Sequence, residues 1–240
     1  SAIQGFNSKI PRVMDFALYN AFTKAFSERG EYWEHGMTRI YKTLQNDFLY
    51  PNINNVLIFA ENHDTNRIND SYPKFKSYKR IMAALMTLRG IPQIYYGSEI
   101  GMTGKKENGD GDIRRDFPGG WISDKKNAFN KKERTPVQKS YFNFTKKLIN
   151  WRRTKSVIHK GKTLHYVPEN DVYVYFRYSE KSCVMVIINN SPEKQNLSLD
   201  RFHEGISGRT NGYEIISEKQ INLAKNLEVS PETAYIIELQ

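Results

Sequence analysis

The sequence predicts an α/β fold followed by an all-β domain, and three observations lead to this prediction. Short apolar segments alternate with long helical patterns up to about residue 155. Beyond that point the pattern consists of short strands separated by turn residues. The 240 residues, 39% hydrophobic and 13% aromatic, are enough for one large or two small domains with packed cores. We therefore expect domains at residues 1–155 and 156–240.

The first predicted strand–helix unit has a short strand at 13–16 and a helix over 18–28. A loop at 46–55 leads to the next strand. The continuous apolar run at 56–59 is typical of a parallel strand that is buried on both faces. The helix that follows has one apolar face, and Gly90 stands where a glycine would end it.

The third unit comprises a strand at 91–96, a long Gly- and Asp-rich loop at 97–132 and a helix over 135–153. Pro92 cannot donate a hydrogen bond, so we place it at the beginning of the strand. The β-α-β-α-β-α order implies a parallel sheet with right-handed crossovers. Three such units make up about three-eighths of a (β/α)8 barrel.

The C-terminal part is predicted to be an antiparallel β-sandwich. Turn residues such as Pro168-Glu169-Asn170 separate its apolar or alternating runs. The runs lie at 172–177, 183–188, 197–199, 213–216 and 235–237. Short strands at this spacing are typical of a sandwich.

Composition excludes several classes of protein. No stretch approaches the roughly 20 apolar residues of a membrane span. No secretory signal pattern is visible either, but a mature or trimmed chain would have lost one, so this excludes nothing. Cys183 is the only cysteine, so an internal disulfide is excluded. The net charge of +10 would suit nucleic acid, but Lys and Arg are scattered among Asp and Glu, which favours an ordinary solvated surface. We expect no nucleic-acid partner and no membrane span.

Polar residues directly follow two of the predicted strands. The run at 56–59 leads into Glu-Asn-His-Asp at 61–64, and the next strand leads into Tyr-Gly-Ser-Glu at 96–99. In parallel α/β folds the carboxyl ends of the strands face the ligand. A single Asp after a strand would indicate a helix cap or a loop ion pair, whereas four polar residues in a row favour a site.

The loop after the third strand holds a second group of candidate residues. Glycines in Gly109–Trp121 let the backbone approach a ligand, and its Asp and Arg residues offer acceptors and donors to hydroxyls. The spacing of Asn108, Asp110 and Asp112 is that of a calcium loop. However, Ile113 stands where an EF-hand needs Gly, and the Glu at the twelfth position is absent. We therefore expect no metal site in this chain.

Together these segments resemble the α-amylase family (glycoside hydrolase family 13). Residues 59–64 are similar to its fourth signature segment, at the end of barrel strand seven, and residues 90–99 to its strand-eight segment. Residues 13–16 fit strand six, and the loop at 110–121 is similar to that of neopullulanases and cyclomaltodextrinases. The resemblance covers nearly the whole chain. It implies the C-terminal part of a (β/α)8 TIM barrel, strands six to eight, followed by the family's antiparallel β-sandwich C domain.

The resemblance also implies residue roles. Asp64 would be the third catalytic carboxylate, which stabilises the transition state, and His63 would donate a hydrogen bond to the sugar in the cleavage subsite. Asp110 and Arg114 would hold the neighbouring glucose, although Gly111 replaces the family's usual proline. The expected substrate-binding residues are Asn62, Arg67, Tyr96, Asp110 and Arg114. Arg67 and Tyr96 are expected at the rim, with packing or an ordinary surface position as the alternative.

The implied parent is a retaining hydrolase of α-glucosidic bonds in maltooligosaccharides, cyclodextrins or pullulan. Such an enzyme needs a nucleophile and an acid/base carboxyl roughly 5 Å apart, which the family places after strands four and five. Neither segment is found in residues 1–240, so we expect the isolated chain to be inactive.

The alternatives are a non-catalytic carbohydrate-binding fragment and, from another class, a basic nucleic-acid-binding protein. The partners implied by the first interpretation are an α-glucan oligosaccharide, the missing N-terminal part of the barrel, or a second copy in a homodimer. We expect no cofactor here, and calcium only in the missing part. Family members of this type occur in the periplasm or the cytoplasm; we expect the periplasm.

Overall fold

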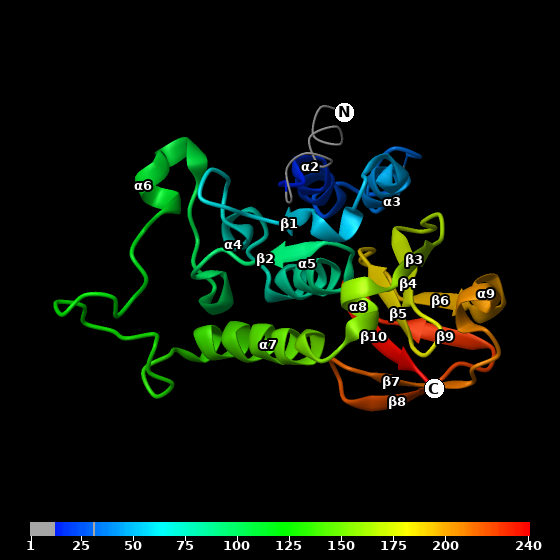
Figure 1. Ribbon diagram of the computed structural model, residues 1–240. Coiled ribbons are helices and arrows are strands. Elements are labelled where there is room, and N and C mark those ends of the chain that lie inside the picture. The colour runs from blue at the N-terminus through cyan, green and yellow to red at the C-terminus, as the bar shows by residue number, and fades with distance from the viewer. Residues whose placement is uncertain (1–12, 31) are drawn as a thin grey trace.

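The structure is a computed structural model that describes residues 13–30 and 32–240. An α/β part, residues 13–153, is followed by a β-rich part, residues 162–240, which we call the β part (Figure 1). The predicted fold class is confirmed. Figure 1 also shows the loop between β2 and α7 extending away from the body, on the side opposite to the β part.

The strand predicted at 13–16 is reduced to a single parallel bridge between Met14 and Leu57. It is this short because Asp15 is already the N-cap of helix α2 (Phe16–Ala25). The Asp15 Oδ1 atom accepts a hydrogen bond from the backbone N–H of Leu18 at 2.9 Å. An aspartate that caps a helix ends the extended segment before it.

Strands β1 (Leu57–Phe59) and β2 (Ile91–Gln93) pair in parallel, with Leu57 opposite Ile91. Both are shorter than the apolar runs that predicted them. Gly90 was predicted to end the preceding helix, and this is wrong. Helix α5 (Phe75–Thr87) is capped by Leu88, and Gly90 lies beyond the cap with φ of +93°. A Cβ at Gly90 would come 2.5 Å from the carbonyl oxygen of Val56, so the glycine allows the two strands to approach.

The remaining elements of the α/β part are helices and short 3-10 turns. The helix predicted at 135–153 begins with a capping box in which Thr135 and Gln138 bond each other's backbone N–H groups. The bounds are α3 (Thr38–Leu44), η1 (Asp47–Leu49), η2 (Ile53–Asn55), α4 (Ile68–Ser71), η3 (Ser98–Ile100), η4 (Lys106–Asn108), α6 (Asp110–Ile113) and α7 (Pro136–Arg153). Among the described residues, no helix is long and apolar enough to cross a membrane.

The β part contains a six-stranded antiparallel sheet in the order β3-β4-β5-β10-β7-β8 and a separate antiparallel pair, β6-β9. The bounds are β3 (Lys162–His165), β4 (Val172–Tyr178), β5 (Cys183–Asn189), β6 (Gln195–Ser198), β7 (Asn211–Glu214), β8 (Lys219–Asn222), β9 (Asn226–Val229) and β10 (Thr233–Leu239). Three short helices, η5 (Leu199–Phe202), α8 (Ser156–Lys160) and α9 (His203–Ile206), also lie beyond residue 155, where only strands were predicted. They are too short to produce a helical period in the sequence.

Both faces of the six-stranded sheet are buried. Tyr173 and Val186 belong to a core shared with helices α5 and α7, whereas Phe176 and Ile187 belong to a second core with residues of β6 and β9. Burial on both faces explains why β5 is apolar throughout.

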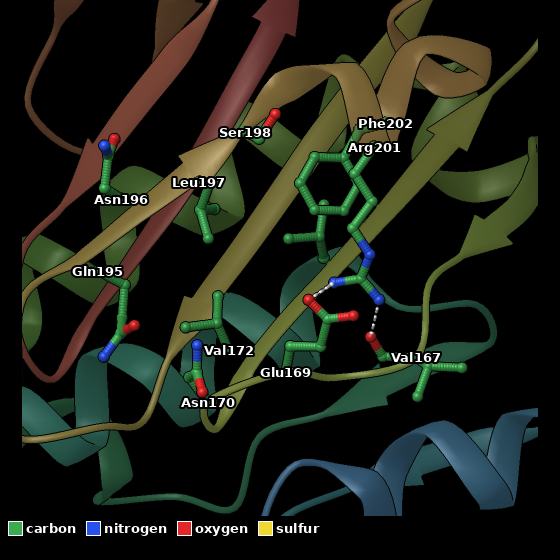
Figure 2. A pocket seen from close by; sticks show the side chains of 11 residues that line it. Val167, Glu169, Asn170, Val172, Gln195, Asn196, Leu197, Ser198, Arg201 and Phe202 are labelled. Atoms are coloured by element: carbon green, nitrogen blue, oxygen red, sulfur yellow. Dashed lines mark hydrogen bonds and ion pairs between the residues drawn. The ribbon is translucent and has the colours of Figure 1, made fainter.

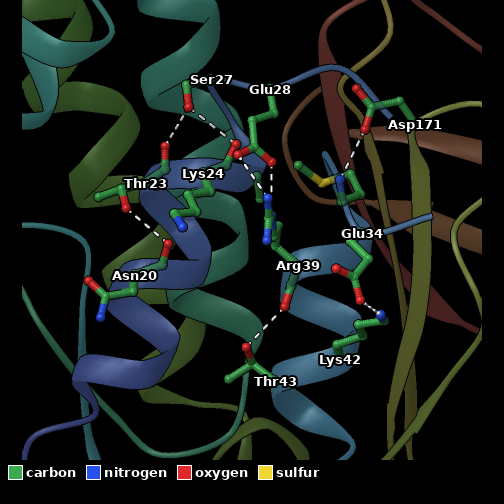
Figure 3. Close-up of polar contacts among 12 residues, drawn as sticks. Asn20, Thr23, Lys24, Ser27, Glu28, Glu34, Arg39, Lys42, Thr43 and Asp171 are labelled. Carbon is green, nitrogen blue, oxygen red and sulfur yellow. Dashed lines mark hydrogen bonds and ion pairs between the residues drawn. The ribbon is translucent and has the colours of Figure 1, made fainter. Parts of the chain in front are cut away.

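A buried carboxylate joins the two parts. Asp171 accepts hydrogen bonds from the backbone N–H of Met37 at 3.0 Å and from Asn190 Nδ2 at 3.1 Å. Figure 3 shows Asp171 close to the start of α3, with the Glu28–Arg39 ion pair (2.9 Å) linking the segment after α2 to α3.

Candidate active site

The chain leaves β1 through a turn that is held by its own side chains. Asn62 Oδ1 accepts from the backbone N–H of Asp64, and Thr65 Oγ1 accepts from the N–H of Asn62, both at 2.8 Å. Asn62 is buried, whereas His63 and Asp64 are exposed. The structure therefore places the Asn62 side chain under the turn, where it fixes the position of Asp64.

Four of the predicted site residues form one cluster. Arg114 donates to Asp64 Oδ1 at 2.8 Å and forms an ion pair with Asp110 Oδ2 at 2.9 Å. The Nε atom of Arg114 donates to the backbone oxygen of His63 at 2.9 Å, and His63 Nε2 lies 3.1 Å from Asp64 Oδ2. Each side chain exposes about half of its surface, 41% to 58%. The arrangement alternates donors and acceptors, as binding of sugar hydroxyls requires.

The loop after β2 is what brings Asp110 and Arg114 to Asp64. Its backbone is attached to the β1 turn by two hydrogen bonds, from Lys106 N to Asn66 Oδ1 at 2.6 Å and from Arg67 N to the oxygen of Gly104 at 2.9 Å. Lys106 also pairs with Asp110, and this hydrogen bond lowers the pKa of the Asp110 carboxyl.

Arg67 and Tyr96 occupy different environments. Arg67 is fully buried, and its guanidinium lies over the rings of Tyr95 and Tyr96, 3.9 and 4.8 Å from their centroids. Its Nε donates to the backbone oxygen of Ile113 and its Nη1 to that of Tyr96. The expectation that Arg67 lies at the rim is wrong, because these contacts require a position behind it. Tyr96 is 39% exposed, and its hydroxyl donates to the oxygen of Arg115.

Glu61 is a residue of this region to which the sequence assigned no role. Its buried carboxylate accepts hydrogen bonds from the backbone N–H of Ile68 and from Ser98 Oγ, and it lies 3.7 Å from Arg67 Nη1. Burial raises the pKa of Glu61 to about 7, and the nearby Glu99 contributes in the same direction. A carboxylate that directly follows an apolar strand is the signal that could have predicted this burial.

The calcium-like spacing does not form a metal site among the described residues. Asp110 faces Lys106 and Arg114, whereas Asp112 accepts from the backbone N–H of Lys105 and from Asn108 Nδ2. No group of three or more His, Cys, Asp or Glu in this part of the chain could hold a metal ion.

A cavity of about 210 Å³ in the β part is separate from this cluster. Figure 2 shows Val172, Leu197 and Phe202 at its lining and the Arg201–Glu169 ion pair, 2.9 Å, at one side. None of the predicted site residues lines it.

Comparison with known proteins gives two family matches. Residues 6–151 match the α-amylase catalytic domain family, and residues 163–238 match the cyclo-malto-dextrinase C-terminal domain family. A cyclomaltodextrin glucanotransferase of Niallia circulans is 33% identical over 158 residues, which is 66% of this chain and 19% of that protein. A cyclomaltodextrinase of Thermoanaerobacter pseudethanolicus is 28% identical over 228 residues, covering 94% of this chain and 35% of that protein.

Solved structures show the same fold. The α-amylase of Geobacillus thermoleovorans, complexed with acarbose, matches all of this chain with a TM-score of 0.78 at 20% identity. The chain covers 50% of that structure, and it spans about a third or less of the two relatives named above. The catalytic-domain match extends over more than half of the sequence, so the chain belongs to the α-amylase family.

Proposed function

We propose that this chain forms one side of the substrate-binding face of a retaining α-glucan hydrolase of the cyclomaltodextrinase or α-amylase type. The observation that carries the proposal is the ion-paired cluster of Asp64, Arg114 and Asp110, with His63 beside it. These residues come from segments about 50 positions apart and meet beyond the carboxyl end of β1. Active sites of (β/α)8 barrels lie at this end of the strands.

The cluster suits a transition state that develops positive charge on a sugar ring. Asp64, fixed by the turn at Asn62, would stabilise that charge and bind ring hydroxyls more tightly as the ring distorts. His63 would donate to the same sugar. Asp110 and Arg114 would bind the neighbouring glucose, and the half-exposed ring of Tyr96 offers a stacking face at the rim.

Hydrolysis also needs a nucleophile and an acid/base carboxyl, which we assign to the strand-four and strand-five segments of the family. The other barrel strands are the partner that we propose for this chain. In the described residues β2 pairs only with β1, so its second edge is free to receive another strand. Maltooligosaccharides, cyclodextrins and pullulan are the proposed substrates. No cofactor is needed for this chemistry.

The test compares Asp64→Asn with Asp116→Asn in the protein at its natural length. Both variants remove one exposed carboxylate, but Asp116 lies outside the cluster. We expect Asp64→Asn to lower kcat on maltotriose and β-cyclodextrin by about a hundredfold or more, as for loss of one preorganised electrostatic contact. Asp116→Asn should leave kcat within about twofold. Equal effects of the two substitutions would refute the role of Asp64.

A second measurement separates the enzyme from a carbohydrate-binding fragment. Residues 1–240 alone should release no reducing sugar from maltotriose or pullulan, because neither carboxyl segment is present. If the natural-length protein binds maltotriose but also releases no reducing sugar, the non-catalytic alternative replaces the proposal.

A further inference from the structure

A second cavity, of about 300 Å³, lies where the α/β part meets the β part. Asp47 and Arg89 line it from the α/β part, and Lys162, His165 and Arg177 line it from the β part. Its volume is at the lower end of the range of small-molecule sites, about 300–1,000 Å³. The cavity is therefore large enough for a ligand that touches both parts.

This cavity is remote from the candidate active site. Asn54 and Arg89, which line it, precede strands β1 and β2, whereas Asp64 and Tyr96 follow those strands. The two strands are parallel, so the cavity lies at the opposite end of the sheet. A ligand there would not contact a sugar held by the Asp64 cluster.

The charges around the cavity do not balance within the described residues. Arg89 is ion-paired with Asp15 at 2.8 Å and with Asp47 at 2.6 Å. Arg177 also lines the cavity but makes no ion pair with any carboxylate that the structure describes. The exposed Lys160 and Lys162, which also line the cavity, make no ion pair with a described carboxylate either. Four cationic side chains and one carboxylate, Asp47, thus line the cavity. When Asp15, which pairs with Arg89 from outside the lining, is included, two positive charges remain in excess.

Arg177 is an unusual residue in this position. It is 1% exposed, and its Nη2 donates to the oxygen of Ile158 at 3.0 Å while its Nη1 bonds Thr163. Its Nε has no hydrogen-bond partner in the described structure. Burial lowers the pKa of Arg177 to about 10, so it remains charged at neutral pH. Asp47, the carboxylate that attracts Arg177, is already ion-paired with Arg89. A bound anion would therefore offset part of the cost of burying this charge.

We propose that this cavity binds a phosphate dianion, either free or carried on a sugar. Two uncompensated positive charges match a dianion, and guanidinium and ammonium groups are the side chains that bind phosphate oxygens best. His165 adds no charge at neutral pH, because burial lowers its pKa. Since the lining comes from both parts of the chain, the anion would strengthen their association.

Thermal unfolding of the protein at its natural length tests this proposal. Inorganic phosphate should raise Tm along a saturating curve, above the rise given by sodium chloride at matched ionic strength. The double variant Lys160→Ser/Lys162→Ser should raise the half-saturating phosphate concentration about tenfold. The matched control Lys219→Ser/Lys225→Ser removes two exposed lysines outside the cavity and should leave that concentration unchanged.

Glucose 6-phosphate forms the third arm of the experiment. If glucose 6-phosphate binds more tightly than inorganic phosphate, the cavity is a site for phosphate carried on a sugar. If it binds equally or more weakly, the cavity is a site for free phosphate. The proposal is overturned if phosphate raises Tm no more than chloride does. It is also overturned if the two double variants have the same half-saturating phosphate concentration. Maltotriose serves as an independent ligand for the Asp64 cluster, so failure here leaves the proposed hydrolase role intact.

Discussion

The α/β part and the β part are organised by different forces. In the β part, strands of up to seven residues pair on both sides, and both faces of the sheet are covered by apolar side chains. In the α/β part, the described strands are three residues long, and charged side chains such as Glu61, Arg67 and Arg89 are buried around them. Apolar packing therefore carries the β part, whereas buried ion pairs and hydrogen bonds fix the strand ends in the α/β part.

The largest effect is expected from removing apolar volume in the β part. Phe176 is fully buried, and its ring packs against Tyr166 and beside Gly205. Phe176→Ala should lower the free energy of unfolding by about 3–5 kcal/mol, because it leaves a cavity in a sheet that cannot collapse. Phe129→Ala, at a side chain that is 63% exposed, should cost less than about 0.5 kcal/mol. Similar losses in denaturant titration of both variants would contradict this account of the β part.

The α/β part should respond to pH instead. The carboxyl of Glu61 loses its proton near its ordinary pKa of about 4.5 in the unfolded chain but only near 7 in the folded one. The unfolded state is therefore favoured progressively as pH rises from about 4.5 to 7, by at most about 3.5 kcal/mol at roughly 1.4 kcal/mol per pH unit. Glu61→Gln should flatten this fall in stability. An unchanged slope in the variant, measured by urea titration at several pH values, would show that Glu61 titrates normally.

The sequence-based predictions were also of different accuracy in the α/β part and the β part. Periodicity located β4, β5, β6, β7 and β10 of the β part and the helix α7, because apolar burial leaves a regular pattern. It missed β3, β8 and β9, which are four residues long and partly exposed. The cluster of His63, Asp64, Asp110 and Arg114 was predicted through polar residues at strand ends and the family resemblance. The buried role of Arg67 could not be read from the sequence, because a charged residue looks the same whether it is solvated or desolvated.

The cavity between the parts could not be predicted either. Its charge excess depends on which residues of the β part dock against the helices, and docking leaves no local pattern. The lengths of β1 and β2 were overestimated for a related reason. Val56 and Ile94 are apolar because they pack in the interior, although neither belongs to a strand.

A smaller effect is expected at the contact that joins the two parts. Asp171→Asn keeps a side chain that tolerates the positive φ of 58° but replaces a charged acceptor of the Met37 N–H with a neutral one. The free energy of unfolding should fall by about 1–2 kcal/mol. Asp200→Asn, at an exposed position of the β part, is the control and should change it by less than about 0.5 kcal/mol. If the two variants unfold at the same urea concentration, Asp171 does not link the parts.

The smallest effect concerns helix α7 of the α/β part, which contacts both parts. It packs on α5, and its Trp151 donates to Glu238 of β10 at 2.6 Å. Thr135→Ala removes the cap that accepts from the N–H of Gln138, so the free energy of unfolding should fall by about 1 kcal/mol. Ser140→Ala lies within the same helix and should be neutral or slightly stabilising, because alanine favours helix. Since α7 contacts both parts, the loss in Thr135→Ala should appear in hydrogen exchange of α5 and β10 alike. If protection against hydrogen exchange falls in α5 alone, the two parts unfold independently. The α/β part and the β part would then be separate folding units.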